Sequence, residues 1–261
     1  MSGKRNCEEI HLARIMKGEK AKEEISDIVA KESFLSIILN EEKLISLKCS
    51  PENYDYLGIG FLYTSGILKK KEDISSIVVD EEQKTIKIKA KNIYSLLKGS
   101  LRDSVVPRRS NIDEKLISKL LPKKCILKVK SNIIFSLMQA MQGRAKLFKL
   151  TGGVHSCALA DKQGCIILFT EDISRYNTID KILGEAFYKN IPQEDKIILT
   201  SCRITSDILV KIALGRVPII VSRAAPTDWA IDLAKRVGVT LVGFVREERM
   251  NIYTHPQRIE V

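Results

Sequence analysis

The sequence has no paired cysteines of the kind that hold a zinc ribbon or a small disulfide-linked fold. Its six cysteines are dispersed, and no two of them form a C-x-x-C pair: Cys7, Cys49, Cys125, Cys157, Cys165 and Cys202. We therefore expect free thiols rather than a disulfide framework or a structural zinc site.

Long apolar stretches are missing as well. No run approaches the roughly 20 apolar residues that cross a bilayer, and the N-terminal segment has no apolar core behind its charges. We expect a cytoplasmic protein without a membrane partner. The 261 residues, of which 44% are hydrophobic, are enough for one large core or two modest ones, so disorder is not the default.

Acidic residues are fewer than basic ones: 43 Lys and Arg against 32 Asp and Glu leave a net charge of +11, which favours polyanionic partners. Many lysines, however, alternate with isoleucines, as in KTIKIKAK at 84–91, the period-two pattern of a strand with one solvated face. We therefore expect no nucleic-acid partner. The last third carries arginines, whose guanidinium groups suit phosphates: Arg203, Arg216, Arg223, Arg246, Arg249 and Arg258.

The first half of the chain predicts an α+β unit. SFLSIILNEEKLISLKCS contains two apolar runs on either side of Asn40-Glu41-Glu42, which indicates a hairpin, and a second hairpin is predicted from about Ser76 to Ala90. Between them, apolar residues in PENYDYLGIGFLYTSGIL recur near helical spacing. A charged, turn-rich segment at 98–115 is typical of a connecting loop, so we place the domain boundary near 120, with domains at 1–120 and 121–261.

The second half predicts a three-layer α/β domain. A helix with an apolar stripe is expected in SNIIFSLMQAMQGRAKLF, followed by a buried strand in GCIILFTED and a helix in SRYNTIDKILGEAF. Strands KIILT, VPIIVS and VTLVGFV then alternate with helices that close on Gly215 and Gly238. Short apolar strands separated by such helices indicate parallel strands joined by right-handed crossovers.

In an open sheet of this kind, ligands bind beyond the carboxyl ends of the strands. The segments after three of the predicted strands are TSCR, SRAAPTD and FVREERMN, and each supplies an arginine. Guanidinium groups and helix N-termini both bind phosphates. A single arginine at a strand end is more often a solvated charge, but three that converge on one edge predict a phosphate site.

Five segments in order resemble the formate dehydrogenase accessory protein (FdhD) family of sulfur carriers: GFLYTSGIL, TGGVHSCALAD, EDISRYNTIDKILGEAF, SRAAPTDWAIDLAK and LVGFVREERMNIYTHPQRI. The resemblance covers residues 32–261 or so. It implies a C-terminal domain with the cytidine-deaminase-like fold, a smaller N-terminal domain and a homodimer. It also implies a sulfur carrier rather than a turnover enzyme, which accepts sulfur from a cysteine desulfurase and passes it to the molybdenum cofactor, in its bis-guanine-dinucleotide form, before insertion into formate dehydrogenase.

The resemblance places the guanine-dinucleotide contact in the segment FVREER, for which GDP would serve as a mimic. These residues are Phe244, Val245, Arg246, Glu247, Glu248 and Arg249, and the argument from strand ends adds Arg223. Gly152 and Gly153 permit a tight backbone beside His155. For Asp172, Arg175, Asn177 and Asp180, helix capping and domain packing are interpretations as good as ligand contact.

Family members carry a C-x-x-C in the connecting loop, whereas this chain has RDSVVPRRSNID at 102–113, which places Ser104 and Pro107 where the two cysteines would stand. Serine cannot form a persulfide, and proline has no side-chain nucleophile. Cys202, which follows a strand and precedes Arg203, is a minority candidate for a relocated thiolate, whereas Cys157 in the apolar run CALA is better explained as a core residue.

Two alternatives to the sulfur carrier remain. One is a cofactor-binding chaperone that does not transfer sulfur. The other is a zinc deaminase, which would need H-x-E and P-C-x-x-C; here HSC lacks the glutamate and SCRIT has Thr205 in place of the second cysteine. Only His155 and Cys202 would remain as ligands, too few for a catalytic zinc, so we expect no metal site.

Overall fold

The computed structural model describes residues 6–18, 22–93 and 127–261. Its centre is a six-stranded sheet with the order β13-β12-β11-β10-β8-β9. The strands are β8 (His155–Ala160), β9 (Ile166–Asp172), β10 (Ile197–Thr200), β11 (Ile219–Ser222), β12 (Thr240–Gly243) and β13 (Asn251–Ile252). The neighbours β10, β11 and β12 run parallel as predicted, while β8, β9 and β13 pair antiparallel with their neighbours. The sheet is therefore mixed.

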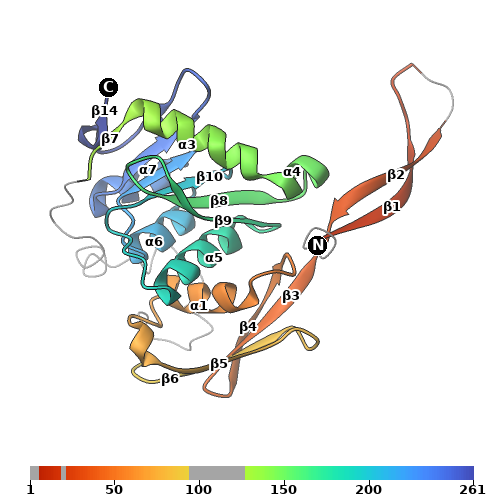
Figure 1. The fold of residues 1–261 in the computed structure, drawn as a ribbon, viewed down its shortest axis with the longest axis horizontal. Coiled ribbons are helices and arrows are strands. Elements are labelled where there is room, and N and C mark those ends of the chain that lie inside the picture. Colours follow the sequence, from red (N-terminus) through yellow and green to blue (C-terminus); the bar gives the residue numbers. More distant parts are fainter. Residues whose placement is uncertain (1–5, 19–21, 94–126) are drawn as a thin grey trace.

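Helices cover both faces of this sheet, as Figure 1 shows. Successive strand residues point to opposite faces, so Ile197 packs with α3 (Ser131–Arg144) on one side and Ile198 packs with the helices on the other. Those helices are α5 (Arg175–Tyr188), α6 (Ser206–Leu214) and α7 (Asp228–Val237). The predicted three-layer α/β domain is confirmed, and so is the stripe of α3, whose buried residues are Ile134, Leu137, Met138 and Met141.

The N-terminal half contains the two predicted hairpins and the helix between them. The elements are β3 (Ser33–Leu39), β4 (Glu42–Cys49), α1 (Tyr54–Thr64), the short helix η2 (Lys71–Asp73), β5 (Ile74–Asp80) and β6 (Thr85–Ala90). The first hairpin turns at Asn40 and Glu41, whose φ angles of 46° and 74° fit a tight two-residue turn. Parallel pairing of β3 with β6 joins the hairpins into one four-stranded sheet.

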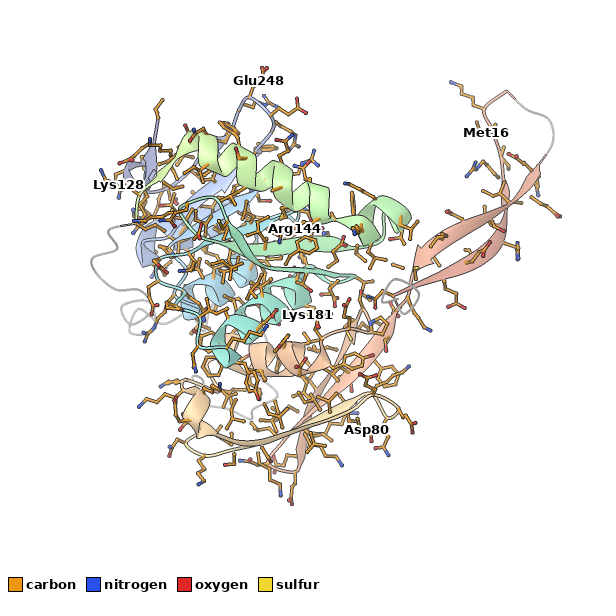
Figure 2. The ribbon with its side chains drawn as sticks, viewed as in Figure 1. Met16, Asp80, Lys128, Arg144, Lys181 and Glu248 are labelled. Atoms are coloured by element: carbon orange, nitrogen blue, oxygen red, sulfur yellow. The ribbon has the colours of Figure 1, made fainter. Side chains whose placement is uncertain are left out.

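A buried ion pair of the C-terminal half binds the backbone of Ser50 and so attaches the N-terminal half to α5. Lys181 contacts Asp172 at 2.7 Å, and the two side chains are 1% and 0% exposed. The Asp172 carboxylate also accepts from the Ser50 amide at 3.1 Å, which fixes the segment after β4. Lys181 is labelled in Figure 2. Because every oxygen of this carboxylate has a donor, the burial of the pair is compensated.

A hairpin that the sequence analysis did not predict precedes these elements. Strands β1 (Cys7–Arg14) and β2 (Glu23–Ala30) pair antiparallel and form an arm that projects from the body of the molecule (Figure 1). At the other end of the described chain, β14 (Ile259–Glu260), preceded by the short helix η4 (Pro256–Arg258), pairs with β7 (Val129–Lys130).

Three details differ from the sequence prediction or lie beyond it. Strand β9 is half-buried at a sheet edge rather than fully buried. Gly215 and Gly238 directly follow α6 and α7, as predicted, but only Gly238 is left-handed, with a φ of 77°, and after α6 the left-handed residue is Arg216. The domain boundary near 120 and the connecting loop lie outside the described residues. Among the helices that the structure describes, none has the length and apolar character to span a membrane.

Candidate functional site

The carboxyl ends of β10, β11 and β12 meet at one edge of the central sheet, because these strands are parallel. The segments that follow them are tied together: the Ile204 amide donates to Ala225 O at 3.1 Å, and the Thr227 amide donates to Ile204 O at 2.9 Å. Antiparallel β8 begins at the same edge, so Gly152, Gly153 and His155 arrive there too. The segments after β10, β11 and β12, which the sequence predicted to share one edge, are therefore neighbours in space.

A pocket of about 560 Å³ lies at this edge, between α3 and the loops that follow β11 and β12. Its residues are Met141, Gln142, Ala145, Phe148, Lys149, Gly152, Gly153, Val154, His155, Ser156, Ser201, Arg223, Ala224 and Arg246. One wall, from α3 and α4 (Lys146–Thr151), is mainly apolar, and the opposite wall carries two arginines. The volume is in the range of sites for ligands of nucleotide size, roughly 300–1,000 Å³.

Arg246 connects the two arginine-bearing loops. Its Nη1 donates to Arg223 O at 2.6 Å and to Val245 O at 2.9 Å, so one corner of the guanidinium holds the backbone. The Ser222 hydroxyl adds a second link, since it donates to Cys202 O at 2.6 Å and accepts from the Ala224 amide at 2.9 Å. Hydrogen bonds to the backbone thus hold the loops that form this wall of the pocket in place.

The segment from Phe244 to Arg249 has an unusual backbone. Phe244 has a φ of 53°, a left-handed conformation that costs a residue with a Cβ about 1–2 kcal/mol. Two hydrogen bonds maintain it: the Phe244 amide donates to Ala224 O at 3.2 Å and the Val245 amide to Ser222 O at 3.1 Å. Strain of this kind is concentrated at functional sites.

The six predicted contact residues of this segment differ in exposure and in their position relative to the pocket. Arg246 lines the pocket, and Glu247, Glu248 and Arg249 are exposed on the loop between β12 and β13, where Figure 2 labels Glu248. Val245 is 0% exposed and belongs to the core beneath the sheet, so its side chain cannot contact a nucleotide in the pocket. The left-handed Phe244 interrupts the alternation of β12 and turns the Val245 side chain into the core that also contains Val242.

The other predicted arginines separate into two groups. Arg223 lines the pocket and Arg203 is exposed at the same edge. Arg216 instead pairs with Glu194 at 3.5 Å, and Arg258 Nη1 donates to Gly238 O at 2.8 Å, which ties η4 to the end of α7. These last two have structural partners away from the pocket.

His155 lies on the pocket wall and is half-buried. Burial lowers its pKa from the usual 6.5, the positive charge of Arg175 lowers it further, and Asp172 opposes both effects. The imidazole is therefore neutral at pH 7 and presents one donor and one acceptor nitrogen. Arg175 itself donates from Nη2 to Tyr176 Oη at 2.9 Å.

The polar set at the start of α5 has mainly a structural role. Asp172 accepts from Asn177 Nδ2 at 3.0 Å and from the Ser174 amide at 2.8 Å, in addition to its ion pair. Asp180 binds Lys211 at 2.8 Å and accepts from the Thr64 hydroxyl at 2.5 Å, again across the contact between α5 and α1. For these residues the packing interpretation is the better one.

Three of the described cysteines, Cys49, Cys157 and Cys202, are buried and have the properties of structural thiols, whereas Cys165 is exposed. Cys202, the candidate for a relocated thiolate, is 1% exposed, and burial raises its pKa although a hydroxyl, Thr200 Oγ1, lies 3.1 Å from its sulfur. Cys157 is 0% exposed, as predicted, and its pKa is raised well above the usual value by burial. A reactive thiolate needs the opposite environment. Ser104 and Pro107 lie outside the described residues.

No three His, Cys, Asp or Glu side chains of the described ranges gather closely enough to hold a metal ion.

Sequence reasoning missed the wall of the pocket formed by α3 and α4. Phe148 falls beyond the buried stripe of α3 and is 46% exposed, and Lys149 follows it. An apolar residue outside an amphipathic stripe, close to a Gly-Gly pair, was the available signal.

Comparison with known proteins identifies the relatives of this fold. The model of the FdhD/NarQ family matches residues 30–260. Sulfur carrier protein FdhD of Wolinella succinogenes is 34% identical over 244 residues, which are 91% of this chain and 84% of that protein. The protein of the same name from Bacillus subtilis is 32% identical over 260 residues, 94% of this chain and 95% of that one.

A solved structure agrees with these matches. The crystal structure of a protein described as a formate dehydrogenase accessory protein, from Desulfotalea psychrophila, superposes with a TM-score of 0.81 at 28% identity. The superposition covers 98% of this chain and 100% of that one, so it includes both halves of the molecule.

Proposed function

Because the chain belongs to the FdhD/NarQ family, we propose that it acts in formate dehydrogenase maturation by binding the guanine-dinucleotide end of the molybdenum cofactor in the pocket beside Arg223 and Arg246. The cofactor is cargo that is passed on, with formate dehydrogenase as recipient and a cysteine desulfurase as sulfur source. The observation that carries the proposal is the pocket itself, in which one wall is mainly apolar and the loops after β11 and β12 contribute two arginines.

The two walls suit the two parts of a nucleotide. Phosphate oxygens accept charge-assisted hydrogen bonds from arginine, and the free corners of Arg223 and Arg246 face the pocket from one side. A purine ring is apolar on its faces and pairs well with Met141 and Phe148 on the other side. A pocket of about 560 Å³ holds one nucleotide, so the remainder of the bis-dinucleotide extends beyond it.

The sulfur-carrying step is the less supported part of the proposal. In that step a thiolate attacks the sulfane sulfur of the desulfurase persulfide, so that the carrier becomes the persulfide and the desulfurase cysteine leaves as a thiolate. Cys49, Cys157 and Cys202 are buried, and burial raises the pKa of Cys49 to about 12. With Ser104 and Pro107 at the family's cysteine positions, a cofactor-binding chaperone without sulfur transfer is the favoured alternative.

Titration with GDP tests the binding proposal. We expect binding by the wild type and at least about tenfold weaker binding by Arg223→Ala, because a hydrogen bond to a charged group contributes about 1.5–3 kcal/mol. Arg249→Ala should behave in the same way if its exposed side chain folds over the ligand. Arg216→Ala is the matched control, since this arginine pairs with Glu194 elsewhere. No binding by the wild type, or equal affinity of Arg223→Ala and wild type, would refute the site.

A further inference from the structure

Strand β9 has an open side. It is the outermost strand of the central sheet and pairs with β8 alone among the strands that the structure describes (Figure 1). In β8, the Ser156 amide and carbonyl both bond toward β10, each to Ser201 at 3.0 Å. Glu171, which is paired with Ser156, therefore turns its own amide and carbonyl away from β8. Phe169 does the same, because backbone groups alternate along a strand.

The backbone groups of Phe169 and Glu171 thus form an edge to which another strand can bond. No described residue bonds to them from the open side. Unpaired amide and carbonyl groups in a row are a template for pairing with another chain. The edge by itself accepts any extended segment, so the side chains beside it determine which segment fits.

A second pocket, of about 260 Å³, opens on this side of β9. We call it the β9 pocket. Phe169, Thr170 and Glu171 of β9 line it, together with residues from the segment before β1, from the segment between β4 and α1, and from α4. Because α4 contributes Leu147 to this pocket and Phe148 to the pocket described above, the two are distinct neighbours on either side of one short helix.

The polar lining of the β9 pocket is rich in hydrogen-bond acceptors. Asn6 is 8% exposed, and its Nδ2 donates to Glu52 Oε2 at 2.5 Å, but its Oδ1 has no hydrogen-bond partner in the described ranges. The carboxylate fixes this orientation, since a flipped amide would set two acceptors against each other. The carboxylates Glu52 and Glu171 also outnumber the cation Lys146. A ligand that brings positive charge and N–H donors is therefore favoured.

The apolar lining determines the shape of that ligand. Leu147, Leu150 and Phe169 supply it. Lysine and arginine bury an apolar stem against such surfaces while their charged ends reach polar groups, and those ends carry donors only. The volume is less than half that of the other pocket, which suits one side chain rather than a nucleotide.

We propose that β9 and the β9 pocket bind an extended segment of a partner protein, which adds a strand to the open edge and places an arginine or lysine side chain in the pocket. Main-chain hydrogen bonds to Phe169 and Glu171 supply affinity, and the pocket selects the side chain, as in other cases of strand addition. The proposal concerns a separate pocket and holds whether or not a guanine nucleotide binds beside Arg223.

Fluorescence anisotropy with a labelled synthetic peptide tests the choice of side chain. The probe is a short peptide of alternating threonine and valine with arginine at its centre. We expect the wild-type protein to bind it, and to bind the same peptide with a central alanine at least about tenfold more weakly, because charge-assisted hydrogen bonds are lost. No binding of the arginine peptide, or equal affinity for the two peptides, would overturn the proposal.

Two charge reversals test the location of the site. Glu52→Lys places a cation in the β9 pocket and should weaken binding of the arginine peptide at least about tenfold. Glu42→Lys makes the same change of charge on an exposed residue at the far end of β4 and should leave the affinity unchanged. Thermal unfolding followed by circular dichroism checks that both variants are folded. Equal losses in the two variants would show attraction by net charge alone and would refute the site.

Backbone methylation of the arginine peptide tests the pairing with β9. Alternate amides of an extended strand point to opposite sides, so only one alternate set can donate to the edge. Of two forms of the peptide, each N-methylated on one set, one should bind at least about tenfold more weakly than the other. Equal affinities would show that the peptide does not add to the sheet, which contradicts the proposal. Self-association of the wild-type chain that the arginine peptide reverses would show that a second copy covers this edge and would overturn the choice of partner.

Discussion

The backbone of Gly184 in α5 lies directly against the backbone of Gly60 in α1: a Cβ added to Gly184 would stand 2.6 Å from the Gly60 amide nitrogen. A Cβ on Gly60 would stand 1.8 Å from Asp180 O. Real Cβ atoms do not approach backbone atoms so closely. The two helices, one from each half of the molecule, therefore cross at a distance that only glycine permits.

We predict that Gly184→Ala lowers the free energy of unfolding by about 3 kcal/mol, because the helices must separate and the packing on both sides is lost. Gly143→Ala is the matched control. Gly143 also lies in a helix, but a Cβ there meets nothing within 4 Å, so the variant should be about 0.5–1 kcal/mol more stable. Urea unfolding measures both, and equal stability of Gly184→Ala and wild type would contradict the close crossing.

The buried pair of Lys181 and Asp172 yields a second prediction. Lys181→Met leaves a carboxylate at 0% exposure without its counter-charge and should cost about 3–5 kcal/mol. Lys189→Met removes the partner of Glu185 at a position where the lysine side chain is 48% exposed, and it should cost about 0.5 kcal/mol or less. Chemical unfolding at pH 7 compares them. Similar losses in the two variants would show that the Asp172 site is solvated.

His155 makes stability depend on pH in a definite direction. Its pKa in the folded protein lies below the usual 6.5, so below pH 6.5 the unfolded chain takes up a proton that the folded chain refuses. The free energy of unfolding should therefore fall as the pH falls below 6.5, whereas above it both states are neutral and His155 has no effect. His155→Gln should fall less steeply in the same range. Parallel profiles for the two proteins would exclude this contribution.

The loop substitutions allow a test of sulfur transfer. With a desulfurase and labelled cysteine, we expect little persulfide label on the wild type, no change in Cys202→Ala, and a gain in the double variant Ser104→Cys with Pro107→Cys. The flanking Arg102, Arg108 and Arg109 would favour a thiolate there. Cys165→Ser controls for labelling of the exposed thiol. Strong wild-type labelling that disappears in Cys202→Ala would show that this buried sulfur is the carrier.

The local pattern of apolar residues was sufficient to predict the helices and strands of the C-terminal domain. Apolar spacing identified the buried stripe of α3 and the three parallel strands, because burial on one face imposes a period that survives in the sequence. The same reasoning found both N-terminal hairpins. It did not find the arm, since β1 and β2 are charged and mostly exposed and carry little periodic signal.

By itself, the sequence determined the fold class, the family and the edge of the sheet at which the pocket lies, because parallel strands bring their carboxyl ends together wherever their side chains point. Only the tertiary structure decided which residues share the pocket. Phe148 lines the same pocket as Arg223 and Arg246, while Val245, inside the predicted motif, turns into the core. It also decided that Cys202 is buried, and that Gly60 and Gly184 touch. Contacts between residues more than 70 positions apart depend on how the layers stack, and no local period records them.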